Sequence, residues 1–407
     1  MAAAVTAAEL PEGTIISKNN LDKILNDTFE GHTVKSLLTE AMIYQIREWN
    51  LTMKIKHSKA QLKDTRYENA TKAFKGTLRY DPDKNECSGY LAGNPFPDIT
   101  PDDPFIAQKL IWSNYYGTRA GNIQKVPHSW LMIDADKGLE RIVESFWLRY
   151  YTKGRLDNYA NGKSPVEDEK ILSKSIFFIT YPFDLKGMGI FTVRYDNPKF
   201  ADIWIYLKQM RRSRRLSGSG WVDPVAGLDM LYDDIFVLNA RPSWYKSFKL
   251  LDKRQIFCVP NDHTFNFDKE NKDNPEKAYL AVDLKTWPHW NLSNIVEWEP
   301  RELYIIECIP PRHHPYSKRV VYLDTGNPVL YFADCYDKKG NFCKWVHYTF
   351  STYKDPKGYI ILPSGEGFYI DFLQRHASVH YVRQWFANPP EITIDDISLG
   401  KLKEAGK

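Results

Sequence analysis

The feature that most constrains the fold is a succession of short aromatic and β-branched runs, which fills the chain from about residue 176 onward. Clusters of Gly, Pro, Asn and Asp separate these runs, and helical periodicity between them is weak. Phe, Trp and Tyr make up 14% of the chain, and such rings favour pleated, half-buried surfaces. The pattern predicts a large antiparallel sheet with strands at 176–182, 190–195, 201–215, around 236, 248–259, 278–284, 295–309, 318–323, 329–336, 344–353 and 376–385.

The N-terminal third is mainly helical in its pattern. Apolar spacing predicts a short helix near 21–25, capped by Asn19 or Asn20, and a second helix over about 33–46. Apolar and polar residues alternate over residues 51–55, which predicts a strand. The aspartates directly before Pro104 predict the start of a third helix. Strands that follow a helical opening indicate an α+β protein, in which a large antiparallel sheet wraps over helices.

The 407 residues suffice for a deep core, and we expect a single large domain over residues 15–385. Its first part, 15–125, is predicted to be helical and its second part, 126–385, to be rich in sheet. Residues 1–14 are expected to be a flexible N-terminus and residues 386–407 a C-terminal tail. The alanine-rich start, Met1–Ala8, is typical of a chain whose signal peptide has been removed, but a cytosolic protein with an alanine tail fits equally well.

Charge and hydropathy exclude several classes of protein. The 55 Lys and Arg nearly balance the 51 Asp and Glu, so the whole chain gives no argument for binding nucleic acid. No apolar run approaches the ~20 residues that a membrane-spanning helix needs. Motifs for hydrolases, zinc proteases, nucleotide binding and kinases are absent, so we expect a non-enzymatic protein without cofactor or metal.

Two groups of residues carry some catalytic potential. His313 and His314 lie in a proline-bounded run, where surface loop positions are a better interpretation than metal ligands. The carboxylates of Asp229, Asp233 and Asp234 lie within six positions of one another, and paired acids can perform acid and base catalysis. We favour an ion-pair network for these acids, because acids beside a basic strand usually form one.

The most unusual local feature is a run of four arginines around Ser213 that follows an aromatic strand. In extended backbone the arginines alternate between the two faces of the strand. One hypothesis is that they capture a carboxylate or phosphate head group at the mouth of a cavity. The equally weighted alternative is that they pair with the three aspartates above. The four residues are Arg211, Arg212, Arg214 and Arg215.

The strand before these arginines is apolar on both sides. Either both faces of the sheet pack against protein, or one face lines a cavity for an apolar ligand. The candidate lining residues are Phe177, Ile179, Phe191, Val193, Trp204, Tyr206 and Met210.

The five cysteines include no C-x-x-C pair, which argues against a zinc ribbon or a thioredoxin-like site. Cys335 and Cys343 flank a polar turn that contains Gly340 and Asn341, so a hairpin would bring the two residues near each other. A disulfide between them and a pair of free buried thiols are both compatible with the sequence.

Several motifs together resemble an uncharacterised family of Gram-negative proteins whose members are often described as outer-membrane lipoprotein-sorting proteins. The likeness extends over about residues 90–385. It rests on GNPFP at 93–97, KLIW at 109–112, YPFDLKGMG at 181–189, RYD at 194–196, DIWIY at 202–206, RRSRRL at 211–216, GLD at 227–229, Asp233 with Asp234, WEPR at 298–301, YSKR at 316–319 and YDKKG at 336–340.

The resemblance implies a periplasmic protein, exported across the inner membrane, with the fold of the lipoprotein carriers of the Lol pathway. That fold is an open half-barrel sheet curved over helices, which shields acyl chains. The resemblance also implies, by association, an exporter of the resistance-nodulation-division superfamily as a partner. It transfers no catalytic residue, and the sequence departs from the precursor pattern because it lacks a signal peptide and a lipobox cysteine.

The leading hypothesis is a periplasmic carrier or binding protein for a lipid-like molecule, with peripheral contact to the outer membrane. Burial of an acyl chain at ~0.8 kcal/mol per methylene would supply the affinity. The alternative is an envelope interaction or stress-sensing module that binds a protein partner, which a filled sheet interior would favour. An enzyme is the third choice and rests on the aspartates and loop histidines.

Overall fold

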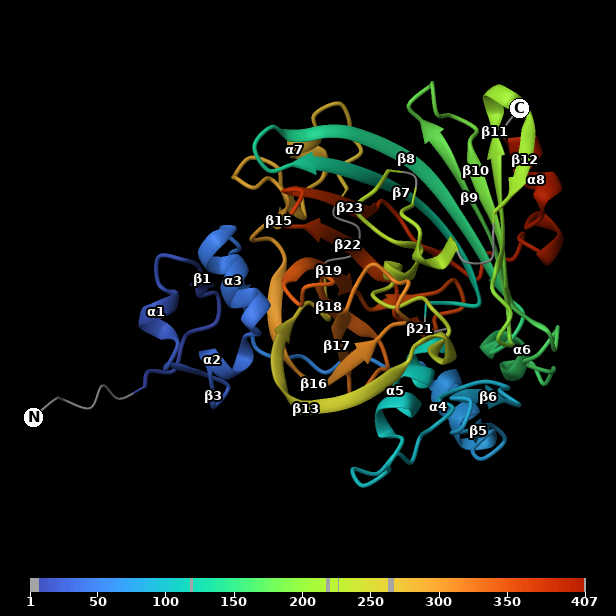
Figure 1. Ribbon diagram of the computed structural model, residues 1–407, viewed down its shortest axis with the longest axis horizontal. Helices are drawn as coiled ribbons and strands as arrows, with labels where there is room; N and C mark the ends of the chain where they lie inside the picture. Colours follow the sequence, from blue (N-terminus) through green and yellow to red (C-terminus); the bar gives the residue numbers. More distant parts are fainter. Residues whose placement is uncertain (1–6, 118–119, 217–219, 226, 263–266, 406–407) are drawn as a thin grey trace, which may run out of the picture.

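The computed structural model describes residues 7–117, 120–216, 220–225, 227–262 and 267–405. Its main element is a 16-stranded sheet that curves through the whole molecule and does not close on itself (Figure 1). From one end to the other the sheet contains β1 Ile15–Ile16, β4 Met53–Ile55, β16 Glu297–Ile309, β17 Lys318–Asp324, β18 Leu330–Tyr336, β19 Phe342–Phe350, β22 Ser364–Asp371, β23 His376–Val382, β7 Ile123–Asp134, β8 Gly138–Tyr151, β9 Ile171–Tyr181, β10 Gly189–Tyr195, β11 Asp202–Leu207 and β12 Arg212–Arg215.

Two further strands and four small hairpins complete the β structure. β13 Ser247–Cys258 pairs with β16, and β24 Phe386–Ala387 pairs with β7. Neighbouring strands of the main sheet are antiparallel, except for the parallel pair β4 and β16. The small hairpins are β2 Thr28–Phe29 with β3 His32–Thr33, β5 Arg79–Asp81 with β6 Glu86–Ser88, β14 Val282–Asp283 with β15 Asn291–Leu292, and β20 Tyr353–Lys354 with β21 Ile360–Ile361.

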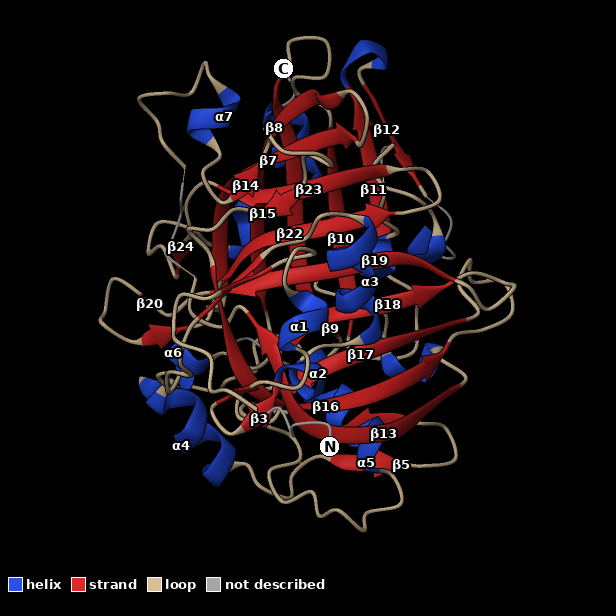
Figure 2. Ribbon diagram, turned by 90° about the vertical axis from the view of Figure 1, so that its left-hand side faces the viewer, coloured by secondary structure: helices blue, strands red, loops and turns tan. Residues whose placement is uncertain are grey.

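The helices lie around the sheet and not within its plane. Figure 1 shows α1–α3 outside the limb formed by β13 and β16–β19, α8 outside the limb formed by β9–β12, and α4–α6 near the lower opening. Figure 2 shows α1–α3 in front of the stacked strands of the first limb. The helices are α1 Leu21–Ile24, α2 Val34–Leu37, α3 Glu40–Glu48, α4 Thr65–Ala73, α5 Ile106–Tyr115, α6 Leu156–Ala160, α7 Pro275–Ala278 and α8 Leu399–Ala405.

The predicted fold class, an α+β protein built on a large curved antiparallel sheet, is confirmed. Most of the predicted strands are present. The strands β7 and β8, which form the longest hairpin of the sheet, were not predicted individually, although they lie mostly within the part expected to be rich in sheet. β22 was also not predicted. The strand expected around Phe236 is wrong: Phe236 and Val237 have φ of 54° and 75° and form a turn.

The predicted helix over 33–46 is two helices. Thr39 interrupts it, because its side-chain oxygen accepts a hydrogen bond from the backbone N–H of Met42 at 3.1 Å and so caps the start of α3. The short helix near 21–25, the strand at 53–55 and the helix after Pro104 are present as α1, β4 and α5.

The described residues near both ends of the chain contact β structure. Within the expected flexible segment, Thr28 N–H donates to the Ala8 carbonyl at 2.8 Å, and Leu10 N–H donates to the Thr28 carbonyl at 2.8 Å. Residues 1–6 lie outside the described part. In the described part of the segment after residue 385, β24 pairs with β7, and α8 packs Leu402 against the outer face of β9–β11.

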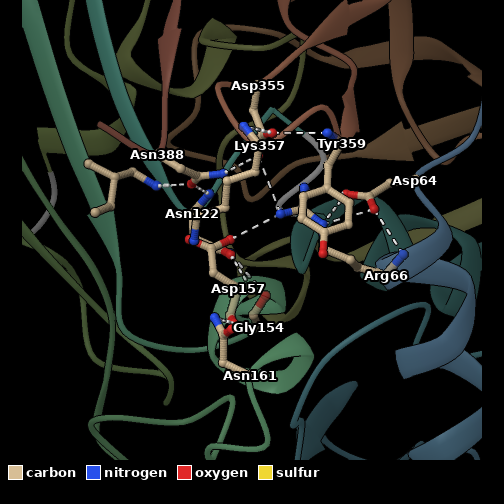
Figure 3. Close-up of polar contacts among 11 residues, drawn as sticks. Asp64, Arg66, Asn122, Gly154, Asp157, Asn161, Asp355, Lys357, Tyr359 and Asn388 are labelled. Carbon is tan, nitrogen blue, oxygen red and sulfur yellow. Dashed lines mark hydrogen bonds and ion pairs between the residues drawn. The ribbon is translucent and has the colours of Figure 1, made fainter. Parts of the chain in front are cut away.

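A buried arginine joins three segments at the lower opening of the sheet. Arg66 of α4 contacts the carboxylates of Asp64 at 2.8 Å and of Asp157 and Asp355 at 3.4 Å, and its guanidinium lies 3.9 Å from the centre of the Tyr359 ring (Figure 3). Three carboxylates around one buried cation compensate for the hydration that it loses when it is removed from water. This cluster fixes α4 to α6 and to the loop between β20 and β21.

No helix in the described ranges is both long enough and apolar enough to cross a bilayer.

The first prediction concerns a buried histidine in the core. His347 lies among the rings of Trp298, Trp345 and Phe368, and burial lowers its pKa to about 3. Between pH 6.5 and about 3 the unfolded chain therefore binds a proton that the folded chain does not, so this residue lowers stability as the pH falls. In H347F, the free energy of unfolding relative to wild type should rise by about 1.4 kcal/mol per pH unit below about pH 6.5.

Urea unfolding between pH 8 and pH 4 measures this difference. The offset between the two proteins at pH 8 is the internal reference. Curves for wild type and H347F that stay parallel over the whole range would contradict the assignment.

Candidate functional site

The candidate site lies on the inner face of the sheet, where one row of side chains crosses five strands. Strand register places Gln124 opposite Arg149, Arg149 opposite Ser175, Ser175 opposite Thr192, and Thr192 opposite Ile203. Directly opposed residues share a face of the sheet. The next row on the same face contains Tyr151 of β8, Ser173 of β9 and Arg194 of β10.

A cavity of about 90 Å³, partly open to solvent, adjoins this face. Its walls are mostly apolar or aromatic, and they come from the two limbs of the sheet, from the end of α5 and the residues after it, and from the segment between β12 and β13. The described lining contains two arginines and no acidic side chain. The lining residues are Asn114, Tyr115, Gly117, Ala120, Gln124, Arg149, Tyr151, Arg194, Phe236, Leu238, Asn239, Val329, Leu330, Phe350, Leu362 and Ser364.

Arg149 is the central polar residue of the cavity and is only 5% exposed. Its Nη1 donates to the hydroxyl of Tyr151 at 3.0 Å. Its guanidinium carbon lies 4.1 Å from the ring centre of Trp147 and 5.5 Å from that of Phe236. Burial lowers the pKa of Arg149 below its usual value, and the positive charge of Arg194 lowers it further.

Arg194 is held by amide groups and not by a carboxylate. Its Nη1 donates to Oδ1 of Asn239 at 3.0 Å and its Nη2 donates to the carbonyl oxygen of Asn239 at 2.8 Å. Its guanidinium carbon lies 5.0 Å from the ring centre of Tyr115. Both arginines of the cavity are therefore held in place while their charge is not neutralised by an acid in the described part of the chain.

The segment between β12 and β13 covers much of the inner face, and an ion cluster anchors it. Arg319 of β17 is fully buried and donates to Asp233 at 3.0 Å, to Asp234 at 3.1 Å and to the carbonyl oxygen of Val237 at 2.7 Å. The hydroxyls of Tyr245 and Tyr316 donate to the two carboxylates at 2.6 and 2.9 Å. Burial raises the pKa of Asp233, but Arg319 and these hydrogen bonds outweigh burial, so the net shift is downward.

His314 belongs to the same cluster. Its Nε2 lies 3.3 Å from Asp233 and its Nδ1 accepts the backbone N–H of Tyr316 at 3.0 Å, which fits a neutral ring that carries its proton on Nε2. Burial lowers the pKa of His314. The expected surface loop position is therefore wrong for His314, which is fully buried. The local sequence could not reveal this, because the partner Asp233 is 81 residues away.

Strained backbone lies between the ion cluster and the cavity. Phe236 and Val237 both have positive φ, which is unfavourable for a β-branched residue such as Val237. The contacts that hold them are the N–H of Phe236, which donates to the hydroxyl of Tyr348 at 3.1 Å, and the bond from Arg319 to Val237. This turn places the Phe236 ring in the cavity wall, where its centre lies 5.5 Å from that of the Trp147 ring in a tilted arrangement.

The acids predicted to form an ion-pair network do so, but with other partners than the arginine run. Asp233 and Asp234 bind Arg319, and Asp229 contacts His376 at 2.6 Å and Ser378 at 2.7 Å. The four arginines of the run are exposed, and Arg215 pairs with Asp202. The alternative in which the arginine run pairs with these aspartates is wrong, because β12 is an edge strand and its arginines are exposed. The arginine run also does not line the described cavity; its residues are Arg211, Arg212, Arg214 and Arg215.

The candidate lining residues are divided between the two faces of the sheet. Phe177 and Ile179 lie on the inner face and pack against the main core. The outer group packs beneath Leu402 of α8, and it contains Phe191, Val193, Trp204 and Tyr206. Met210 lies in a short 3₁₀ turn and is 46% exposed. The seven residues therefore do not form one lining. Phe177 lies opposite Ile190 and Phe191 lies opposite Ile176, so strand alternation places the two phenylalanines on different faces of the sheet.

The described cysteines are all buried and free. Cys335 lies opposite Lys344, and the register shifts directly after it, so Cys343 has no directly opposed partner on β18. The Cys343 thiol donates to the carbonyl oxygen of Cys335 at 3.4 Å. The structure thus corresponds to the second alternative given by the sequence, two free thiols and no disulfide.

Sequence reasoning missed Arg149, Arg194 and Phe236 as site residues. Arg149 lies in the run FWLRYY at 146–151, where alternation places Trp147, Arg149 and Tyr151 on one side. A single arginine among inward-facing aromatic residues was the available signal for this position. Arg194 and Phe236 become part of the site through contacts with segments that are distant in the sequence, which no local pattern reveals.

One comparison with known proteins assigns the chain to a family. The model of the DUF1329 family, described as a protein of unknown function, matches residues 15–391, and the chain belongs to this family. No curated protein matches the chain.

Three solved structures are similar to this chain at 14% identity, each over 72% of it. They are a domain of an outer membrane lipoprotein-sorting protein from Vibrio parahaemolyticus (97% of that chain, TM-score 0.48), a DUF1329 family protein from Desulfovibrio piger (95%, 0.48) and a LolA superfamily protein from Nitrosomonas europaea (98%, 0.42).

The second prediction concerns the ion cluster. In R319L two buried carboxylates lose their cation, and the free energy of unfolding should fall by about 3–5 kcal/mol. The matched control is R215L, which removes an exposed arginine from its pair with Asp202 and should change stability by about 0–1 kcal/mol. Urea unfolding of the three proteins measures both effects, and an R319L variant as stable as R215L would show that the cluster does not anchor the segment.

Proposed function

We propose that this member of the DUF1329 family is a periplasmic carrier or binding protein for a small hydrophobic or lipid-like molecule, which it holds in the cavity on the inner face of the sheet. The observation that carries the proposal is the cavity itself, which two limbs of an open sheet and the anchored segment surround with apolar walls. Apolar cavities with a few convergent polar groups are the usual form of small-molecule sites.

The size of the hydrophobic contribution is sufficient for a reversible carrier. About eight methylene groups removed from water at ~0.8 kcal/mol each give about 6 kcal/mol, or a Kd on the order of 10 µM before the entropic cost of association. Such a ligand can be taken up and released again. The cavity is partly open, so a longer chain can extend from it toward solvent.

The proposal includes transfer of the ligand to or from an envelope exporter, with the resistance-nodulation-division superfamily as the expected class, and peripheral contact with the outer membrane. These parts rest on the resemblance described above. Binding and transfer of this kind need neither catalysis nor a cofactor.

A second candidate is a protein-interaction module of the envelope. It is favoured by the covered inner face, where Trp221, Met230, Leu231 and Tyr245 of the segment before β13 belong to the main core. In this case the cavity would be a packing defect and the partner would bind the outside of the molecule. Ligand binding to the purified protein distinguishes the two candidates.

The third prediction tests the cavity as a ligand site. S364L adds an apolar side chain to its wall, and because the Ser364 hydroxyl has no hydrogen-bond partner, the substitution removes no such bond. S364L should therefore weaken binding of the neutral fluorophore N-phenyl-1-naphthylamine by about tenfold or more, which corresponds to about 1.4 kcal/mol. A fluorescence titration measures the two dissociation constants.

The control is S247L, which places a leucine at an exposed position of β13 away from the cavity. It should bind the fluorophore as the wild type does. Equal affinities of wild type, S364L and S247L, or no binding by the wild type, would favour the interaction module.

A further inference from the structure

We propose that Arg149, with Arg194 beside it, binds the oxyanion end of an amphiphilic ligand, a carboxylate or a phosphate monoester, whose apolar body lies against the opposite wall of the cavity. This inference rests on the proposed function, because it assigns the chemistry of a ligand to the same cavity.

The first argument is the unused hydrogen-bonding capacity of Arg149. A guanidinium has five N–H donors, and in the described chain one hydrogen bond from Arg149 is formed, to Tyr151. Its Nε has no partner, and no described carboxylate lies within 4 Å. Other buried arginines of this protein are paired with acids, as Arg319 and Arg66 are. Arg149 differs from them because its side chain borders a cavity.

Aromatic contacts do not replace the missing counterion. The rings of Trp147 and Phe236 attract the guanidinium. This attraction is smaller than the cost of burying a cation without a counterion. The rings supply no acceptors for the N–H groups at the edge of the guanidinium, of which one donates to Tyr151. An oxyanion at this edge would form the charge-assisted hydrogen bonds that the protein does not provide.

Two more polar atoms of the cavity wall lack partners. The hydroxyl of Ser364 and Oε1 of Gln124 are buried and unpaired, and Gln124 lies directly opposite Arg149 in the sheet. Buried polar atoms in folded proteins are nearly always hydrogen-bonded. Three unpaired polar atoms on residues that line one cavity indicate a polar group of a ligand at this place. Ser364 can donate to an oxyanion, and Gln124 can accept from a hydroxyl group of the ligand.

The charge of the wall determines the sign of the ligand. Arg149 and Arg194 both line the cavity, and the described lining contains no Asp or Glu. Asn239 holds Arg194 in place by two hydrogen bonds without neutralising it. Two like charges repel each other. An anion between the two guanidinium groups would attract both of them and offset this repulsion. A cationic ligand would be excluded from the cavity for the same reason.

The arrangement of the walls determines the shape of the ligand. The arginines belong to β8 and β10 of one limb, whereas Leu330 and Phe350 belong to β18 and β19 of the other. Val329 and Leu362 extend this second wall. A ligand with its charged end at Arg149 would therefore place its apolar body across the cavity. This polarity fits an amphiphile with one anionic end.

Calorimetric titrations with octanoate, octyl phosphate, octan-1-ol and inorganic phosphate test the proposal on the full chain. Wild type should bind octanoate or octyl phosphate about tenfold or more tightly than octan-1-ol, in line with charge-assisted hydrogen bonds. R149M should bind octan-1-ol as the wild type does and should lose the preference for the anion. The matched control R215M, which removes an exposed arginine, should keep the preference.

Each other result counts against the proposal in a distinguishable way. Tight binding of octan-1-ol with no preference for octanoate or octyl phosphate would overturn the anion site and leave the proposed function intact. Failure of all three octyl compounds to bind would overturn both. If inorganic phosphate binds as tightly as octyl phosphate, the site binds a free anion, and the proposal of an amphiphilic ligand is contradicted.

The variant also has a stability readout. R149M removes an unpaired buried cation, so its free energy of unfolding should equal or exceed that of the wild type. A fall as large as that expected for R319L would assign Arg149 to the structure and overturn its role in binding. If R149M does not fold, this result counts as a large loss of stability and assigns Arg149 to the structure. The comparison of octanoate with octan-1-ol on the wild type still tests the anion site.

Discussion

The structure depends on how the inner face of one open, curved sheet is covered. A sheet of this width cannot leave an apolar face in water, and the helices of this chain lie mainly outside the two limbs (Figure 1). The irregular segment before β13 covers the inner face instead. Because irregular backbone has few internal hydrogen bonds, it needs an external anchor, and the buried cluster of Arg319, Asp233 and Asp234 provides it.

The same anchor shapes the cavity. It holds Phe236 and Val237 in strained backbone, which directs the Phe236 ring toward Trp147 and Arg149. Arg319 and Arg149 are thus two buried arginines on the inner side of one sheet, with opposite surroundings. Arg319 donates to two carboxylates and to a carbonyl oxygen and has a structural role, whereas Arg149 lacks an acid and borders open space. This contrast is the basis for assigning the second arginine to a ligand.

Much of the fold could be predicted from the sequence, because alternating aromatic runs and turn clusters act locally. β9, β10 and β13 were found in this way, whereas β7 and β8 were missed. The site was harder to predict. Asp233 was recognised as part of an ion-pair network, but its partner Arg319 lies 86 positions away and no local pattern links the two. The arginine run at 211–215 attracted attention because its residues are consecutive, yet an edge strand leaves them in solvent. The single arginine at 149 lies in the cavity because of the register across β7–β11.

The most direct test is a high-resolution crystal structure of the protein purified from cell envelopes without detergent. The account predicts continuous electron density in the cavity that begins within hydrogen-bonding distance of the Arg149 guanidinium and extends along Leu330 and Phe350. A cavity that contains only separate ordered waters, or that is closed by the chain's own side chains, would contradict it.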